Sequence, residues 1–198
     1  MHEIFEDAHR NHDVDTEHAI SCRARSTHFG GKLFYRESRA CDEPDAAGFL
    51  WRVIPLANPD GLYARPPTRA NARGVDLNRN FETPDWERDA HHYWIKRTGR
   101  DARRNPGPHA GSEIETRWLQ RQIAQFRPDL VISVHAPYNL LDYDGPVPQP
   151  LRFGRLSLNR LGVYPGSLGN YGGVYQQIPV VTIELPHATR MPSLADQK

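Results

Sequence analysis

The chain has 198 residues, of which 38% are hydrophobic and 10% aromatic, and its formal net charge is +1. This length and composition predict one folded globular domain with a sizeable core and exclude a disordered chain. The charge is near zero and no basic stripe is interleaved with aromatic residues, so the sequence lacks the electrostatic pattern of a nucleic-acid-binding protein.

Cysteine content and hydropathy exclude two further classes. Cys22 and Cys41 are too few for a disulfide framework and lack metal-ligand spacing, so we expect two free thiols. No apolar run is long enough to span a membrane, and residues 1–13 are too acidic and polar for a signal peptide. The sequence therefore predicts a cytoplasmic protein without a membrane or nucleic-acid partner.

The chain changes character at residue 49. Residues 1–48 are polar, show little strand or helix periodicity, and carry four histidines within the first 18 positions: His2, His9, His12 and His18. From residue 49 onward the pattern is that of an α/β protein, because FLWRVIPLA at 49–57 is an apolar run of strand length and NPDG at 58–61 is turn chemistry that ends it. We expect a divergent or truncated N-terminal region, 1–48, and a main domain, 49–198.

The second half of the chain predicts further elements. Residues 81–110 are rich in Pro, Gly, Arg and His, which favours a long exposed loop at the rim of a site. Ser112 and Glu115 have capping-box spacing and start a helix that Pro128 ends. Its apolar face consists of Ile114, Trp118, Ile123 and Phe126.

The apolar run LVISVH at 130–135 predicts a strand that is covered on both faces. IPVVTIEL at 178–185 predicts the last strand, and a weaker helix is expected at 151–161. A helix followed directly by such a strand favours a parallel sheet.

Four polar residues are candidates for function. Asn78 and Arg79, in GVDLNRNF at 74–81, place an amide beside a guanidinium, which is how proteins bind a carboxylate. His135 and Glu184 each end an apolar strand, where functional groups gather in open α/β sheets. Taken singly, His135 is as readily a histidine satisfied at a strand end, Arg79 a structural ion pair and Asn78 a turn residue.

Five ordered motifs carry a family resemblance that covers about three quarters of the chain. They are NPDG at 58–61, TRANARGVDLNRNF at 68–81, the helix from SEIE into DLVISVHAP at 112–137, GSLGNYGG at 166–173 and PVVTIELP at 179–186. The chain resembles the zinc metallocarboxypeptidases of the M14 type, and within them the short bacterial branch of murein peptide amidases. The resemblance implies a three-layer α/β/α fold with a mixed, largely parallel sheet, with 49–198 as a carboxypeptidase-like catalytic domain.

The resemblance also implies a role for each matching residue. His135 is expected to bind one catalytic Zn²⁺, and Glu184 to act as the general base that takes a proton from water and delivers it to the leaving amine. Asn78 and Arg79 are expected to hold the terminal carboxylate of a peptide substrate. Two more roles follow from the family: Arg69 would stabilise the oxyanion, and Tyr164 is matched to a substrate-binding tyrosine of a mobile loop, with Tyr171 as the alternative. The branch implies a cell-wall peptide that contains γ-D-glutamyl-diaminopimelate.

The family's first zinc-ligand motif, HxxE, is absent from the sequence. Two imperfect substitutes exist: His12 with Asp15 has the form HxxD, and Glu43 lies in CDEP, where alanine replaces the expected histidine. Catalytic zinc usually has three protein ligands, so His135 alone would bind it poorly. Three interpretations follow: an active zinc peptidase with divergent ligands, an inactive relative that binds carboxylate-ended peptides, or a truncated product without the first ligand motif.

Overall fold

Six strands form one mixed sheet in the computed structural model, which describes residues 18–24, 36–39, 49–146, 148–188, 190 and 193. The order across the sheet is β2-β3-β1-β4-β8-β5. The strands are β1 His18–Ala24, β2 Arg36–Arg39, β3 Phe49–Ile54, β4 Leu130–His135, β5 Leu140–Asp144 and β8 Val180–Glu184.

The predicted α/β class with a mixed sheet is confirmed, although the share of parallel pairing is small. β4 and β8 pair in parallel, whereas the other described pairings within this sheet are antiparallel. β1 lies between β3 and β4, so the interior of the sheet contains a strand from the region in which the sequence showed little periodicity. The division of the chain at residue 48 stays a prediction.

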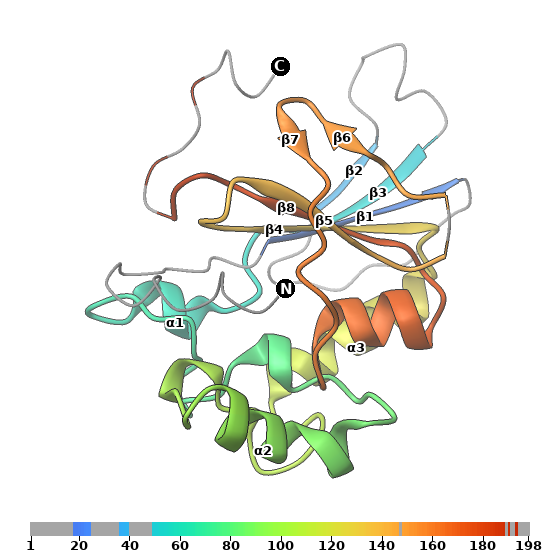
Figure 1. Cartoon of the computed structure of the whole chain (residues 1–198). Coiled ribbons are helices and arrows are strands. Elements are labelled where there is room, and N and C mark those ends of the chain that lie inside the picture. The colour runs from blue at the N-terminus through green and yellow to red at the C-terminus, as the bar shows by residue number, and fades with distance from the viewer. Residues whose placement is uncertain are drawn as a thin grey trace.

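The helical segments lie on one side of this sheet (Figure 1). They are α1 Pro59–Tyr63, the 3₁₀ turns η2 Leu77–Arg79 and η3 Ala102–Arg104, α2 Trp86–Arg97, α3 Ile114–Phe126, and the π-helical η4 Gly169–Tyr175. On the other side, the short strands β6 Arg152–Phe153 and β7 Leu156–Ser157 form a hairpin. Among the described residues, the second helical layer of the predicted three-layer fold is not seen. None of the described helices has the length and apolar character that a membrane crossing requires.

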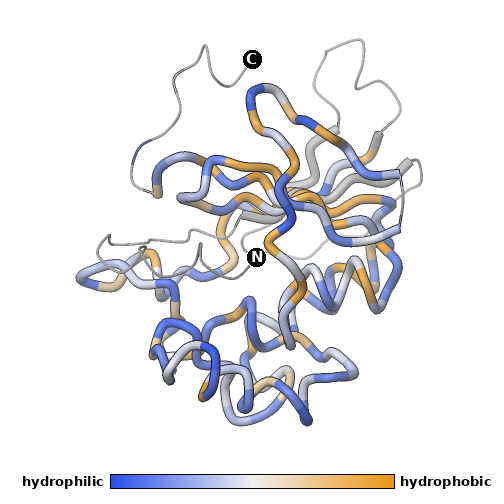
Figure 2. The backbone as a smooth tube through the Cα atoms, in the orientation of Figure 1, coloured by the Kyte–Doolittle hydropathy of each residue, from blue (hydrophilic) through white to orange (hydrophobic). Residues whose placement is uncertain are grey.

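Apolar clusters lie on both faces of the sheet, and hydrophobic residues are frequent along β4, β5 and β8 (Figure 2). The cluster under the helices contains Ile54, Ala57, Phe81, Leu119 and Tyr171. The cluster under the hairpin contains Leu141, Tyr143 and Val181, with Leu156 and Ile183 packed against it. Because side chains alternate along a strand, the second cluster fixes which residues of β5 and β8 point the other way, toward the helices.

The predicted loop at 81–110 is wrong in its central part, where the chain forms the 12-residue helix α2. Its only buried residues are Trp86 and Ala90, so the sequence shows little helical periodicity. Two other features stabilise it. Glu87 and Asp89 in the first turn, and Lys96 and Arg97 in the last, complement the helix dipole, and the Trp86 indole N–H donates to the Arg79 carbonyl oxygen at 2.8 Å.

The predicted helix at 151–161 is also wrong, because this segment contains the β6–β7 hairpin and then extended chain. Gly154 has φ +55° in the turn between the two strands, a conformation that glycine adopts at little steric cost. Leu156 packs against the apolar cluster on this face of the sheet. The packing of Leu156 and the turn at Gly154 therefore outweigh the weak helical periodicity of this segment.

The starts of α3 and α1 differ in detail from the sequence prediction. α3 begins with Glu113 as N-cap, and the expected capping box of Ser112 and Glu115 does not form: the Ser112 hydroxyl donates to Glu113 Oε1 at 2.6 Å. Ile114 is 67% exposed, so it does not share the apolar face of α3. The NPDG motif ends β3 as predicted but also starts α1, because the Asn58 side chain accepts the backbone N–H of Gly61 at 3.0 Å.

Candidate functional site

His135 and Glu184 are neighbours at the carboxyl ends of the parallel strands β4 and β8. They are register partners, so their side chains point to the same face of the sheet. Both are buried, with 6% and 5% of their surface exposed. Leu141 and Ile183 pack in the cluster under the hairpin, so His135 and Glu184 face the helical side. An imidazole and a carboxylate thus lie side by side where the sequence predicted them.

The ring of His135 has a defined polar neighbour within the sheet. Its Nε2 lies 2.8 Å from the hydroxyl oxygen of Ser133, which is two residues earlier on the same face of β4. The backbone carbonyl of His135 accepts the N–H of Leu185 at 2.7 Å, so the pairing with the β8 segment continues past Glu184. The sheet therefore fixes the backbone on both sides of this pair.

The second part of the site is built around one buried carboxylate, Asp76. The Arg69 Nε donates to Asp76 Oδ2 at 2.8 Å, and the other carboxylate oxygen caps η2 by accepting the backbone N–H of Asn78 at 3.0 Å. Asp76 is 1% exposed. Burial alone would raise the pKa of Asp76, but the guanidinium groups of Arg69 and Arg79 and these hydrogen bonds together lower it below its ordinary value. One carboxylate therefore organises two arginines.

Among Arg69, Asp76 and Arg79, Arg79 is the group whose charge is least balanced by its neighbours. It is 6% exposed, and burial together with the like charges of Arg69 and Arg104 lowers its pKa, against the opposing charge of Asp76. One Nη donates to the neighbouring Asn78 carbonyl at 2.6 Å, and the guanidinium carbon lies 4.5 Å from the centre of the Tyr164 ring. Among the described residues, its Nε has no hydrogen-bond partner. A buried guanidinium with an unused donor is suited to an anionic ligand.

Asn78 lies beside Arg79 with its amide oriented by another predicted motif. Its side-chain oxygen accepts the backbone N–H of Leu168, in GSLG, at 2.7 Å. The side-chain NH₂ group is therefore the part of Asn78 that can donate to a ligand. Gly166 of the same motif has φ +74°, and a Cβ there would lie 2.1 Å from the Arg79 carbonyl oxygen, so this close approach requires glycine.

Tyr164 packs on the guanidinium of Arg79. Its hydroxyl donates to the Leu161 carbonyl at 2.8 Å, its ring meets Tyr93 edge-on at 5.4 Å, and burial is the largest cause that raises its pKa. Tyr171, the alternative, is 7% exposed and packs on Phe81 in the core. Both tyrosines thus have packing partners in this structure.

Two contacts link the arginines to the sheet. The Tyr164 hydroxyl bonds to Leu161, whose backbone N–H donates to Asp142 Oδ1 at 3.0 Å. Asp142 is the register partner of Thr182, two residues before Glu184 and on the same face. On the other side, Arg104 hydrogen-bonds the side chain of Tyr138, three residues after His135. The two parts therefore belong to one continuous region on the helical side of the sheet.

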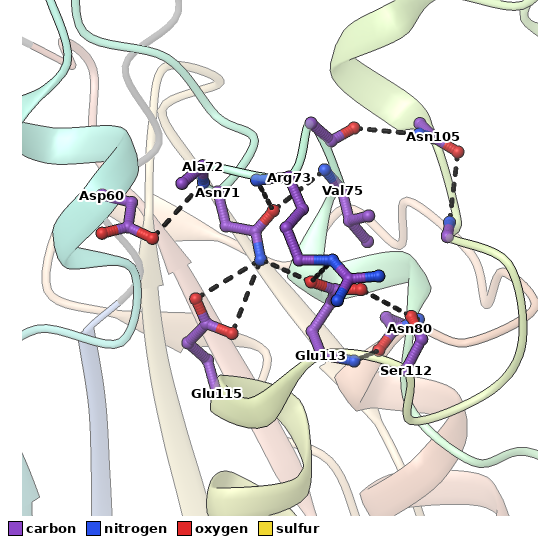
Figure 3. Close-up of polar contacts among 12 residues, drawn as sticks. Asp60, Asn71, Ala72, Arg73, Val75, Asn80, Asn105, Ser112, Glu113 and Glu115 are labelled. Carbon is purple, nitrogen blue, oxygen red and sulfur yellow. Dashed lines mark hydrogen bonds and ion pairs between the residues drawn. The ribbon is translucent and has the colours of Figure 1, made fainter.

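A buried polar network holds the arginine-bearing segment against the start of α3 (Figure 3). The Asn71 amide donates to Glu113 Oε2 at 2.8 Å, and the Asn80 amide donates to the Ser112 hydroxyl at 3.0 Å and accepts the Glu113 backbone N–H at 3.0 Å. Glu113 and Asn80 are 1% and 0% exposed. Both ends of residues 71–80, which carry Asp76, Asn78 and Arg79, are thus fixed to the start of α3.

The described residues do not complete a catalytic zinc site. They contain no group of three His, Cys, Asp or Glu side chains placed to hold a metal ion. His135 supplies one donor of a type that zinc prefers, whereas the catalytic form needs three protein ligands. The candidates His12, Asp15 and Glu43 lie outside the described residues. The donors described here therefore do not fit the metal by themselves.

Two residues of the site escaped the sequence interpretation, Asp76 and Arg104. Asp76 stands inside the motif VDLNRN, and an acid next to two functional arginines could have been read as their counterion. Arg104 lies in the segment interpreted as a loop, and no pattern around it indicated a partner. Only the contacts of η3 in the structure place Arg104 in the site.

Comparison with known proteins identifies the family. The family model for zinc carboxypeptidases matches residues 46–145. Murein peptide amidase A of Escherichia coli (strain K12) is 40% identical over 87 residues, which are 43% of this chain and 35% of that protein. The corresponding protein of Vibrio campbellii is 34% identical over 143 residues, which are 68% of this chain and 56% of that protein.

A solved structure agrees with these relatives. The crystal structure of murein-tripeptide amidase MpaA from Escherichia coli O157 matches with a TM-score of 0.51 and 29% identity, over 69% of this chain and 58% of that chain. The alignments thus span from about a third to somewhat more than half the length of these relatives. From the ordered motifs, the sheet and these matches, the chain belongs to the M14 zinc carboxypeptidase family, in the branch of murein peptide amidase A.

Proposed function

We propose that this chain hydrolyses the amide bond next to a free carboxylate end of a peptide, with murein-derived peptides as the substrate class. The observation that carries the proposal is the register pairing of His135 with Glu184 on the face of the sheet that is linked to the arginines. The relatives are named as murein peptide amidases, which supports the choice of substrate.

Each residue has a task in this proposal. Asn78 and Arg79 bind the terminal carboxylate through an amide N–H and a guanidinium whose Nε is unused. Arg69, held by Asp76, donates to the carbonyl oxygen as negative charge develops on it. Glu184 takes a proton from the attacking water and delivers it to the leaving amine. Burial of these groups strengthens their electrostatic interactions with the substrate.

Zinc is part of the proposal but not of the described donor set. In this family the metal supplies Lewis-acid chemistry, and His135 is the described residue that would help to hold it. The other ligands must come from elsewhere, and His12 with Asp15, or Glu43, are the candidates in this sequence. Elemental analysis of the purified protein tests this directly: one zinc per chain is expected, and a metal-free protein that hydrolyses peptides would refute it.

A second function has its own support. Asn78 and Arg79, the residues proposed to bind the carboxylate, lie side by side in the described part of the chain, whereas no set of three metal ligands is found among the described residues. A relative that binds carboxylate-ended peptides without cutting them would need Asn78 and Arg79 but no metal ligands. Turnover of a peptide by the wild-type chain, with and without added zinc, separates the two functions.

The experiment that tests the carboxylate site compares a peptide with its C-terminal amide. We expect wild type to prefer the acid, and Arg79→Ala to weaken binding of the acid by about 2–5 kcal/mol with little change for the amide. Arg88→Ala is the matched control, because Arg88 is exposed and pairs with Asp89 on α2. Equal affinity of wild type for acid and amide would rule out the carboxylate site.

A further inference from the structure

The aspartate at the start of α2 does not stabilise its own helix. Asp85 is the N-cap residue of α2, a position where an aspartate side chain usually accepts a backbone N–H of the first turn. Its side chain makes no such bond. The side-chain nitrogen of Asn170 instead lies 3.0 Å from each of the two carboxylate oxygens of Asp85. The Asp85 carboxylate is therefore committed to a distant segment of the chain.

Asn170 belongs to a compact turn, residues 164–170. The Ser167 hydroxyl accepts the Asn170 backbone N–H at 3.1 Å, and the Ser167 N–H donates to the Tyr164 carbonyl at 3.0 Å. The Asn170 side chain also reaches the Tyr164 carbonyl, at 3.3 Å. Asn170 is 8% exposed, so these bonds are shielded from water. A shift of Asn170 would therefore move the whole turn.

This turn contacts both residues of the proposed carboxylate site. The Leu168 N–H donates to Asn78 Oδ1 at 2.7 Å, and the Tyr164 ring centre lies 4.5 Å from the guanidinium carbon of Arg79. An asparagine amide has an acceptor on one side and a donor on the other. With the Leu168 N–H in place, the oxygen of Asn78 is occupied and its NH₂ group is left for a carboxylate. Without that N–H, the amide would be free to rotate and to present its oxygen, which repels a carboxylate.

The start of α2 also holds the other side of the site. The Trp86 indole N–H donates to the Arg79 carbonyl at 2.8 Å, and Trp86 is 1% exposed. Trp86 and Asp85 are adjacent in the chain, so one helix end fixes both the backbone of Arg79 and the turn that lies over it. The Thr83 hydroxyl adds a second bond to the turn by accepting the Gly166 N–H at 3.0 Å. Removal of the Asp85 side chain would thus loosen the turn without releasing it.

We propose that Asp85 is a positioning residue of the carboxylate site, which acts through Asn170 to keep the Leu168 N–H on Asn78 and the Tyr164 ring on Arg79. This inference rests on the carboxylate site proposed above. It adds that the discrimination between a carboxylate and an amide depends on α2, an element to which the proposed function gives no role.

The test compares the affinities for two peptides that differ only in a free C-terminal carboxylate or a C-terminal amide. Both dissociation constants are measured by titration, so the test does not require turnover. In Asp85→Ala we expect the preference of wild type for the acid to fall about tenfold, because the misoriented Asn78 amide weakens binding of the acid and not of the amide. Asp89→Ala is the matched control. It removes an acidic residue from the same first turn, where Asp89 pairs with Arg88 on the surface, and should keep the preference within about twofold.

A second variant removes the same contact from its other side. Asn170→Ala should reproduce the loss of preference, and Asp85→Ala combined with Asn170→Ala should lose little more than Asn170→Ala alone, because the two residues act through one pair of bonds. Should Asp85→Ala fail to fold, Asp85→Asn takes its place, since it keeps the size of the side chain but removes the charge and one acceptor oxygen. A fall in the preference for the acid is again expected.

The outcomes separate this inference from the proposed function. An unchanged preference in the Asp85 variants overturns the role of Asp85 and leaves the carboxylate site intact. An equal loss of affinity for acid and amide shows a general structural effect and also overturns it, as do losses in the two single variants that multiply in the double variant. A wild type that binds acid and amide equally overturns the carboxylate site, and the role of Asp85 with it.

Discussion

Asp76→Asn tests the claim that a single buried carboxylate organises the arginines. Asparagine keeps the size of the side chain and an oxygen that can cap η2, so the change removes charge and little else. It leaves Arg69 and Arg79, which are 90% or more buried, without their shared counterion. Removal of one partner from a buried pair costs about 3–5 kcal/mol, and the retained cap places the expected loss near the lower end, at roughly 3 kcal/mol.

The assay is urea unfolding at pH 7 of wild type, Asp76→Asn and Asp89→Asn. Asp89 also pairs with an arginine, Arg88, but on the surface of α2, so its substitution should lower the free energy of unfolding only slightly and by much less than Asp76→Asn does, including its contribution at the N-terminus of the helix. The pH dependence provides a second readout. The folded pKa of Asp76 is lowered, so its stabilisation is present above the unfolded value of 3.8 and is lost as pH falls through the folded pKa.

The difference between wild type and Asp76→Asn should therefore shrink as pH falls below about 4, because the unfolded wild-type chain then binds a proton at Asp76 while the folded carboxylate, whose pKa is lower, still resists protonation. Two results would refute the reasoning. A loss in Asp76→Asn no larger than that in Asp89→Asn would mean that the buried charge does not organise the site. A difference that stays constant down to pH 2 would mean that the mutant fails for steric reasons.

Three further changes have distinct signatures. Glu184→Gln removes the proton acceptor while keeping its shape, so turnover should fall at least 100-fold with affinity for an acid-ended peptide nearly unchanged; equal losses in both would contradict a role as base. Burial and the nearby Asp142 raise the pKa of Asp144 to about 6, so Asp144 destabilises the fold increasingly as pH rises from 3.8 to 6, and Asp144→Asn should gain about 1–3 kcal/mol at pH 7.5 but little at pH 4 by denaturant titration. Gly166→Ala should destabilise by about 2 kcal/mol or more and weaken peptide binding, because its φ of +74° and its approach to the Arg79 carbonyl exclude a Cβ; an unchanged melting temperature would disprove the constraint.

The part of the fold that could be predicted from sequence is the part fixed by local pattern. β4 and β8 are short apolar runs that each end in a polar residue, and the structure places their ends side by side as register partners. Because both faces of these strands are buried, nearly every residue along them is hydrophobic, and this pattern is visible in the sequence. The prediction of a mixed α/β sheet succeeded for this reason.

What could not be predicted depends on contacts between distant segments. α2 has only two buried residues, and its Trp86 and Trp94 side chains are anchored by hydrogen bonds to the Arg79 and Asp101 carbonyls. Such bonds leave no periodicity in the sequence. The Ser112 hydroxyl illustrates the same limit, because it bonds to Glu113 and Asn80 within a tertiary network in place of the local capping box.

Different contacts position the two parts of the site, so one part can lose its function while the other keeps its structure. His135 and Glu184 are positioned by the pairing of β4 and β8, whereas the arginine segment is positioned by Asp76 and by the bonds of Asn71 to α3. The hydrogen bonds described above for Asp76, Asn78 and Arg79 run to other partners than His135, so a chain that does not bind zinc should still keep the proposed carboxylate site. This separation is compatible with both proposed functions, hydrolysis and peptide binding without cleavage, so binding and turnover must be measured separately for this chain.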